Sequence, residues 1–149
     1  MKRIAQHGGS RGHAAVEMAL MSPWLFLLFA GIVDFGFYSY AAIVTANAAR
    51  VAALYTSSDS SLAADQATAC TTYVLPEMNR LPNTRSLSDC SNSTVTVTAT
   101  SSPSPCVTRS ACDTVVQVTY KTDLLLTVPG LINQMTITRT ATMKVNPDI

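Results

Sequence analysis

The chain has 149 residues, enough for one domain of ordinary size. Only 13% of its residues are charged, against about 25% in typical soluble domains, while 48% are hydrophobic. The net charge of +1 excludes a broad positive field for nucleic acid, and the low charge also excludes long charge-driven disorder.

The first predicted element is a long apolar helix near the N-terminus. Sixteen uncharged residues lie between Glu17 and Asp34. A helix over residues 14–37 would span about 36 Å, which exceeds the roughly 30 Å hydrocarbon core of a bilayer. A buried core helix is the less favoured alternative, because the rest of the chain is too polar to surround it. We therefore expect a membrane-spanning helix.

The flanking charges predict how this helix is oriented. Lys2, Arg3 and Arg11 precede it, and no acidic residue occurs before Glu17. The positive-inside rule then keeps the N-terminus in the cytoplasm and exports the C-terminal part. A secretory signal peptide is an alternative, but its apolar part is usually about 7–15 residues long, which is shorter than the run found here.

Glu17 is the informative position of the helix. A carboxylate at the edge of an apolar helix needs either water or a cationic partner. Cleavage between Gly12 and His13 would create an α-amine four residues before Glu17. The amine and the carboxylate could neutralise each other between neighbouring subunits in a low-dielectric bundle. The alternative is that Glu17 simply reaches the cytoplasmic interface.

Two further residues are expected to shape this helix. Pro23 removes one backbone donor and crowds the preceding turn, so we expect a kink there. Asp34 is expected at the periplasmic interface, because a lipid-facing carboxylate costs free energy. A solvated carboxylate is favoured over a specific subunit contact at Asp34.

Beyond Tyr55 the pattern predicts a small α+β domain. Residues 62–75 suit a second helix that ends before or near Pro76, after a loop with Asp59, Ser60 and Ser61 as candidate caps. Residues 93–100, 114–122 and 135–145 alternate with period two and are rich in β-branched residues. We expect an antiparallel sheet of about three strands, with the second helix and the distal half of the first packed on one face. Pro129-Gly130 predicts a turn before the last strand.

Four cysteines, Cys70, Cys90, Cys106 and Cys112, lie in the part that is expected to be exported. They allow three pairings. We favour Cys106–Cys112, which closes a short loop, and Cys70–Cys90, which ties the second helix to the following loop. Disulfides persist outside the cytoplasm. A metal site is less favoured, since no C-x2-C pair occurs and no exported histidine lies near the cysteines.

The sequence offers no catalytic motif. Its two histidines are His7 and His13, both at the N-terminus, which argues against a histidine base for a serine or cysteine nucleophile. No Walker loop, G-x-S-x-G or H-E-x-x-H is present. We expect no enzyme activity, no cofactor and no bound metal.

Three motifs carry a family resemblance: RGHAAVEMAL at residues 11–20, GIVDFG at 31–36 and NAAR at 47–50. Together with the apolar run, they resemble the TadE-like family of the tight-adherence (Tad/Flp) pilus system. The C-terminal stretch from residue 115 to 145 also resembles the closing strands of that family. The resemblance covers both ends of the chain and is weaker in the middle.

The resemblance implies a minor pilin or pseudopilin that supports adhesion and colonisation. Residues 1–12 would be a prepilin leader, 13–57 the transmembrane and assembly helix, and 58–149 the extracytoplasmic domain. The prepilin peptidase would cut after Gly12, and Glu17 would act as the pilin glutamate. The partners implied are this peptidase, other pilins, the Tad inner-membrane platform and the lipid bilayer, with no nucleic acid. The protein would start in the bacterial inner membrane and reach the pilus or cell surface after assembly.

Two alternatives remain open. The first is an uncleaved, membrane-anchored extracytoplasmic binding module. The second is a secreted adhesin-like domain released by signal peptidase. The mass of the N-terminus separates the three, since it would identify His13, Met1 or a residue well downstream.

Overall fold

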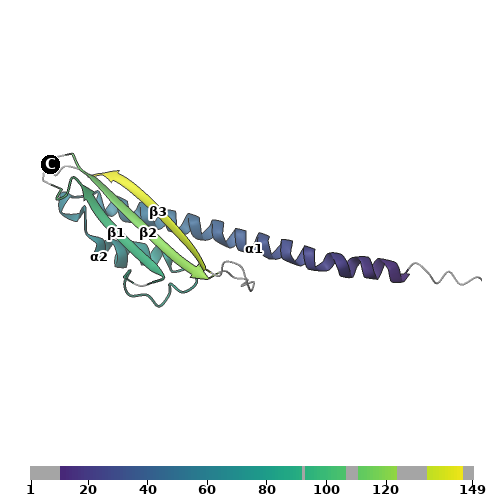
Figure 1. Cartoon of the computed structure of the whole chain (residues 1–149). Helices are drawn as coiled ribbons and strands as arrows, with labels where there is room; N and C mark the ends of the chain where they lie inside the picture. The colour runs from purple at the N-terminus through teal and green to yellow at the C-terminus, as the bar shows by residue number, and fades with distance from the viewer. Residues whose placement is uncertain (1–10, 92, 107–110, 124–133, 146–149) are drawn as a thin grey trace, which may run out of the picture. The chain divides into compact units, whose positions relative to one another are not determined.

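The computed structural model describes residues 11–91, 93–106, 111–123 and 134–145 (Figure 1). The chain divides into two compact units, Met1–Gly36 and Phe37–Ile149. Each unit is described by itself below. The turn expected at Pro129-Gly130 lies outside the described residues.

Helix α1 (Arg11–Thr56) has 46 residues and supplies the described part of the first unit. Ala, Leu and Met, which favour helices, recur along it. Apolar side chains lie all around its N-terminal half, as in a helix that is surrounded by an apolar environment. The helix continues through Pro23 without a break. The predicted long N-terminal helix is confirmed; it begins two residues before the expected start at residue 13 and ends one residue before the expected end at residue 57.

The second unit contains a three-stranded antiparallel sheet in the order β1-β2-β3. Its strands are β1 (Val95–Ser102), β2 (Asp113–Asp123) and β3 (Gln134–Lys144). Val118 of β2 lies opposite Val97 of β1 and opposite Arg139 of β3. The three strands and the α+β class are confirmed, because the period-two pattern encodes one buried and one exposed face.

The core lies between the sheet, the last part of α1 and a second helical segment (Figure 1). On α1 the buried residues are almost all alanines. Those in the main core are Ala41, Ala42, Ala48, Ala49, Ala52 and Ala53. Such small side chains let the helix backbone approach the valines of the sheet closely. The sheet contributes mainly Val95, Val97, Val116, Val118 and Tyr120.

The second helical segment covers residues 66–78 and changes its hydrogen-bond register on the way. It consists of α2 (Gln66–Thr68), the π-helical stretch η2 (Ala69–Val74) and α3 (Leu75–Met78). In front of it, Asp59 caps a short 3-10 turn, η1 (Ser60–Leu62), as one of the candidate caps predicted.

The predicted bounds of this second helix, 62–75, were wrong at both ends. The segment begins at Gln66, where Asp65 provides the N-cap. It continues past Pro76, because the π-helical stretch moves the hydrogen bonds to i→i+5. The Leu75 amide donates to the Cys70 carbonyl in this register. Pro76 then occupies a first-turn position of α3, where a missing backbone donor is tolerated.

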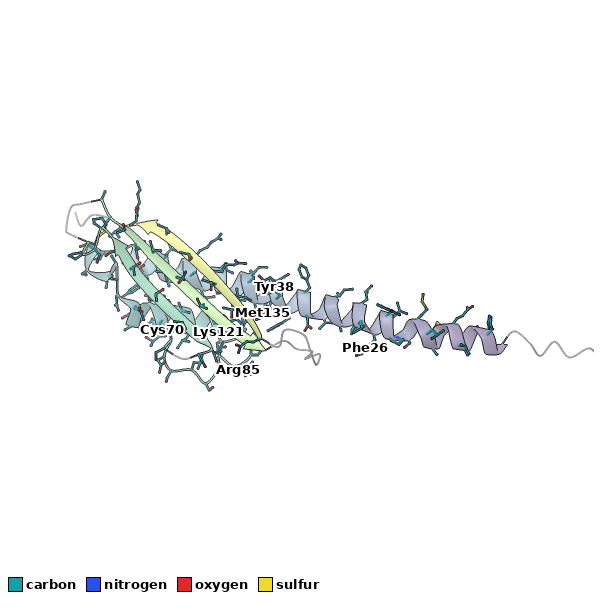
Figure 2. All side chains as sticks on the ribbon, in the orientation of Figure 1. Phe26, Tyr38, Cys70, Arg85, Lys121 and Met135 are labelled. Atoms are coloured by element: carbon teal, nitrogen blue, oxygen red, sulfur yellow. A yellow bond between two sulfur atoms is a disulfide. The ribbon has the colours of Figure 1, made fainter. Side chains whose placement is uncertain are left out.

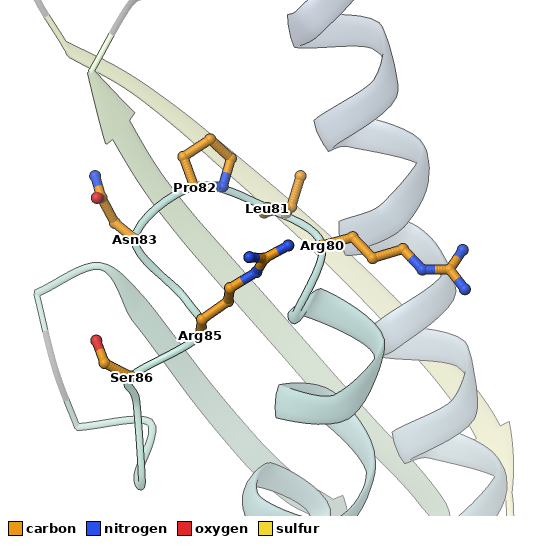
Figure 3. Close-up of a pocket in the computed structure, with 6 residues that line it drawn as sticks. All are labelled: Arg80, Leu81, Pro82, Asn83, Arg85 and Ser86. Carbon is orange, nitrogen blue, oxygen red and sulfur yellow. The ribbon is translucent and has the colours of Figure 1, made fainter.

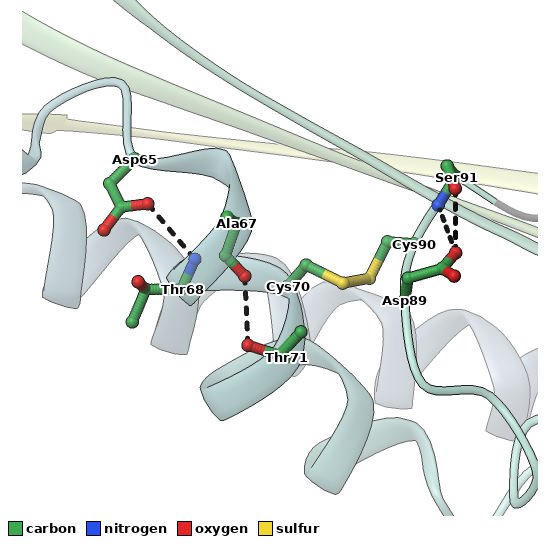
Figure 4. Close-up of a disulfide and its surroundings, with 8 residues drawn as sticks. All are labelled: Asp65, Ala67, Thr68, Cys70, Thr71, Asp89, Cys90 and Ser91. Atoms are coloured by element: carbon green, nitrogen blue, oxygen red, sulfur yellow. Dashed lines mark hydrogen bonds between the residues drawn. A yellow bond between two sulfur atoms is a disulfide. The ribbon is translucent and has the colours of Figure 1, made fainter.

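Both favoured disulfides are present. Cys70 in η2 is bonded to Cys90 in the loop before β1 (Figure 4). Cys106 is bonded to Cys112 immediately before β2. No described cysteine is free. The first bond lies in the main core, whereas Cys112 packs in a separate small cluster with Ala63 and Val145.

Candidate assembly helix and processing site

The predicted processing residues lie in the first turn of α1. Gly12 and His13 are its second and third residues, and both are exposed. A Cβ added at Gly12 would meet no atom within 4 Å. The glycine is therefore not required by packing within this chain. Its position is accessible to a second protein.

Glu17 lies four residues after His13, so the two residues share one face of the helix and are separated by about 6 Å along its axis. Glu17 is exposed. It is the only acidic residue before Asp34. The helix therefore presents a single carboxylate at the start of a long apolar surface.

That surface is formed by large apolar side chains, which are exposed in this structure. Trp24 leaves 73% of its surface uncovered, and Phe26 leaves 63% (Figure 2). The others before Gly36 are Val16, Met18, Leu20, Met21, Leu25, Leu27, Leu28, Phe29, Ile32, Val33 and Phe35. The helix is long and apolar enough to cross a membrane, and only 6% of its most apolar window is buried. A patch of this extent needs lipid or other helices around it.

Pro23 and Asp34 differ in their surroundings. Pro23 is exposed on the apolar part of the helix. Asp34 is half-buried, and its Oδ1 atom is buried without a hydrogen-bond partner in the described structure. An unpaired buried carboxylate oxygen is costly. The described residues therefore leave one carboxylate oxygen of Asp34 without a donor.

The unit Phe37–Ile149 is stabilised by local capping. The Asp65 carboxylate accepts a hydrogen bond from the Thr68 amide at 3.1 Å (Figure 4). It accepts another from the Tyr55 hydroxyl at 3.4 Å. The Thr68 amide and hydroxyl are the main reason why the pKa of Asp65 lies below its usual value. Tyr55 also stacks on Tyr73 with ring centroids 4.5 Å apart. These contacts join the end of α1 to the second helical segment.

The described residues contain no group of three or more His, Cys, Asp or Glu side chains that could hold a metal ion. The surface hollows are shallow. One of about 450 Å³ is lined by Arg80, Leu81, Pro82, Asn83, Arg85 and Ser86 (Figure 3). This hollow and its two arginines are not predictable from the sequence, because no motif or periodicity marks them.

A single long apolar helix followed by a small disulfide-bonded α+β unit is consistent with a membrane-anchored pilin. Comparison with known families agrees, since the model of the TadE-like protein family matches residues 12–54. The suspected resemblance is thus confirmed over the helix, and this segment is TadE-like. No curated protein and no solved structure matches the chain.

The match has a definite extent. It begins at Gly12 and ends within the last turn of α1. It includes Glu17, Pro23 and Asp34 but none of the cysteines. The match supports a pilin role associated with the Tad pilus.

Proposed function

We propose that the chain is a minor pilin or pseudopilin of a Tad-type pilus. It is cleaved after Gly12 and assembles through the N-terminal part of α1, without enzymatic activity. The observation that carries the proposal is that the TadE-like match coincides with a helix whose apolar side chains are exposed. In this role the protein supports pilus biogenesis, surface adhesion and colonisation.

Localisation follows from the same helix. The chain would first span the bacterial inner membrane once, with the domain 58–149 in the periplasm. Two disulfides support an oxidising location for that domain. Its partners would be the prepilin peptidase, other pilins and the Tad inner-membrane platform.

Cleavage changes the charge of the protein. Loss of Lys2, Arg3 and Arg11 reduces ten basic side chains to seven, while all nine acidic ones stay, so the net charge falls from +1 to −2. The cytoplasmic charges that hold the helix in the bilayer are then gone. We infer that extraction of the helix from the membrane becomes easier, because no basic side chain has to cross the apolar core.

The new α-amine at His13 would pair with Glu17 of a neighbouring subunit. In an apolar bundle an unpaired carboxylate costs several kcal/mol, and a cationic neighbour offsets that cost. Removal of one partner of a buried ion pair typically lowers stability by on the order of 3–5 kcal/mol. Asp34 would contact a donor from another helix in the same bundle. Pro23 would set the local bend with which the helices pack.

The deciding experiment is N-terminal mass measurement on protein from purified Tad pili and from membranes. The proposal expects His13 as the first residue in the pili, and Met1 in cells that lack the prepilin peptidase. Met1 in finished pili would refute cleavage and favour the uncleaved binding module. A first residue well downstream of Gly12 would instead favour signal-peptidase release.

Glu17→Gln tests the ion pair directly. We expect normal membrane insertion and a clear loss of incorporation into pili, because a neutral amide cannot balance the amine. Met18→Leu, at the adjacent exposed apolar position, is the matched control and should assemble normally. Asp34→Leu should also lower incorporation, by removing the acceptor. Normal assembly of the Glu17 variant would exclude the ion-pair role.

A further inference from the structure

Three basic residues lie at one end of the sheet. Arg80 and Arg85 are in the loop that follows α3, and Lys121 is near the end of β2. All three are exposed. The loop is tied to β2, because the Tyr120 hydroxyl donates a hydrogen bond to the Pro82 carbonyl at 3.0 Å. The bond places both arginines beside the strand that carries Lys121.

The loop has a fixed shape. Thr84 is buried, and its hydroxyl donates towards the carbonyls of Met78 and Leu81 at 2.6 and 2.8 Å. Asn83 adopts a left-handed conformation with φ of 62°, which asparagine tolerates better than most residues. The two arginines therefore project from a structured loop, around the hollow drawn in Figure 3.

A second hollow connects this loop with the sheet. It is lined by Asn83, Ser93, Thr94, Lys121, Thr122 and Gln134. Asn83 lines both hollows, so they adjoin each other. The basic end thus combines three cations with amide and hydroxyl groups. Guanidinium groups and hydroxyls are the donors that proteins use to bind phosphate.

This is the end of the unit at which the chain leaves for the membrane-spanning segment. At the opposite end, the Thr114 hydroxyl of β2 lies 2.9 Å from that of Thr56, the last residue of α1. From Thr56 back to Tyr38, α1 extends about 27 Å, and from Thr114 to Lys121, β2 extends about 24 Å.

Figure 2 shows Tyr38, Met135, Lys121 and Arg85 at the same end of the sheet. Phe37 is the first residue of this unit and is covalently joined to the apolar segment that precedes it. The basic end is therefore the end nearest to the point where the chain enters the bilayer.

The charges at the two ends of the sheet differ. At the far end, Lys144 of β3 lies opposite Asp113 of β2 in the register, so one cation faces one anion. At the near end, the three cations accompany two acidic residues, Glu77 of α3 and Asp123, the last residue of β2. A net positive charge remains at the near end. Anionic lipid headgroups attract such clusters over a Debye length.

We propose that Arg80, Arg85 and Lys121 form a headgroup-binding surface, which holds the extracytoplasmic domain against anionic phospholipids before assembly. The inference rests on the proposed membrane anchoring and adds a lipid partner to it. Phosphate groups of the outer leaflet would occupy the hollow that the two arginines line. Incorporation into a pilus would then exchange these lipid contacts for contacts with other subunits.

The test uses the full chain in lipid nanodiscs, made either of phosphatidylcholine or of an equal mixture of phosphatidylcholine and phosphatidylglycerol. Amide hydrogen exchange is measured for residues 83–86. We expect exchange to be about fivefold slower or more in the anionic discs, the factor associated with one basic group near an anionic surface. High salt should abolish the difference.

The variant Arg80→Gln/Arg85→Gln/Lys121→Gln should lose this protection, while Lys144→Gln, at the far end, should keep it. Unchanged exchange within β2 shows that the triple variant is folded. Equal exchange in both kinds of disc would overturn the proposal. Slower exchange in phosphatidylcholine discs after addition of inorganic phosphate would also overturn the proposal, since the site would then bind free anions. The N-terminal mass is independent of all these outcomes and tests cleavage separately.

Discussion

The hydroxyl oxygens of Thr56 and Thr114 lie 2.9 Å apart in the core, where the end of α1 meets the beginning of β2. Both residues are fully buried. The Thr114 hydroxyl also donates towards the Ala63 carbonyl at 2.8 Å, which brings in the segment between η1 and α2. Three separate parts of the chain therefore meet at one hydroxyl group.

Thr114→Val should destabilise the domain, because valine keeps the volume but leaves the Ala63 carbonyl without its donor. A loss of about 1–3 kcal/mol in the free energy of unfolding is expected. Urea unfolding of the full chain in detergent can be followed by tyrosine fluorescence, since all five tyrosines lie in the unit Phe37–Ile149. Thr98→Val, on the exposed face of β1, should change stability little. Equal effects of the two variants would contradict a special role for Thr114.

Ala52→Leu should weaken the packing of α1 on the sheet. Ala52 is completely buried, and a larger side chain would push the helix away from the strands. Overpacking of this kind typically costs about 1–3 kcal/mol. Asn47→Leu adds a leucine at an exposed position of the same helix and should be tolerated. The same urea unfolding measurement compares the two variants, and a neutral Ala52 variant would show that the contact can relax.

Removal of the two disulfides should have unequal effects. Cys70 and Cys90 are 20 residues apart, whereas Cys106 and Cys112 are 6 apart. Loop-closure entropy gives about 3 kcal/mol for the longer loop and about 2 kcal/mol for the shorter one. Double alanine variants, compared in urea unfolding under non-reducing conditions, should therefore rank in that order. The buried position of Cys70 and Cys90 in the main core adds to the difference. The reverse order would contradict this reasoning.

Asp65 should make stability depend on pH at the acidic end. Its pKa is lowered in the folded state by hydrogen bonds from Thr68. The charged carboxylate therefore stabilises the fold above its ordinary pKa of 3.8, and this contribution is lost as the pH falls through the lower folded value. Because Asp65 is only partly buried and water screens its charge, we expect less than about 1 kcal/mol.

The variant Asp65→Asn separates charge from capping. Asparagine is also a good N-cap, so stability at neutral pH should change little, while the dependence on pH below about 4 should become smaller. Asp65→Ala loses the cap as well and should be less stable at neutral pH. Unfolding measured from neutral pH to pH 2 checks both. If the stability of Asp65→Asn fell at low pH as steeply as that of the unmodified protein, the pH dependence would come from other groups.

The strands and the long helix were predictable because each has a clear local pattern. Alternation of Val and Thr specifies β1 to within two residues, and the uninterrupted apolar run specifies α1. The second helix was predicted less accurately, since Pro76 normally ends a helix. The π-helical register that accommodates Pro76 depends on packing around Cys70 and Val74, which no local rule encodes.

Some of the candidate functional residues were likewise predictable from the sequence, and others were not. Gly12 and Glu17 could be proposed from the sequence, because their spacing resembles a processing motif, and their roles stay predictions. Arg80, Arg85 and Lys121 are up to 41 positions apart in the chain, and they come together only through the fold. The role of Thr114 was equally invisible, since a threonine in an alternating strand is usually a surface residue. Such features need the tertiary structure, because a one-dimensional pattern holds no information on distant neighbours.

Arg139 gives the sheet a protective edge. It belongs to β3, which has β2 on one side only, and by alternation it shares the inner face with the buried Ile137. If a strand from another protein paired with β3, the charged Arg139 side chain would lose its water. This desolvation costs free energy and therefore disfavours edge-to-edge pairing and amyloid-like stacking. Arg139 therefore disfavours association of two copies through their β3 edges, and in the proposed pilus the contacts between subunits would be left to the N-terminal part of α1.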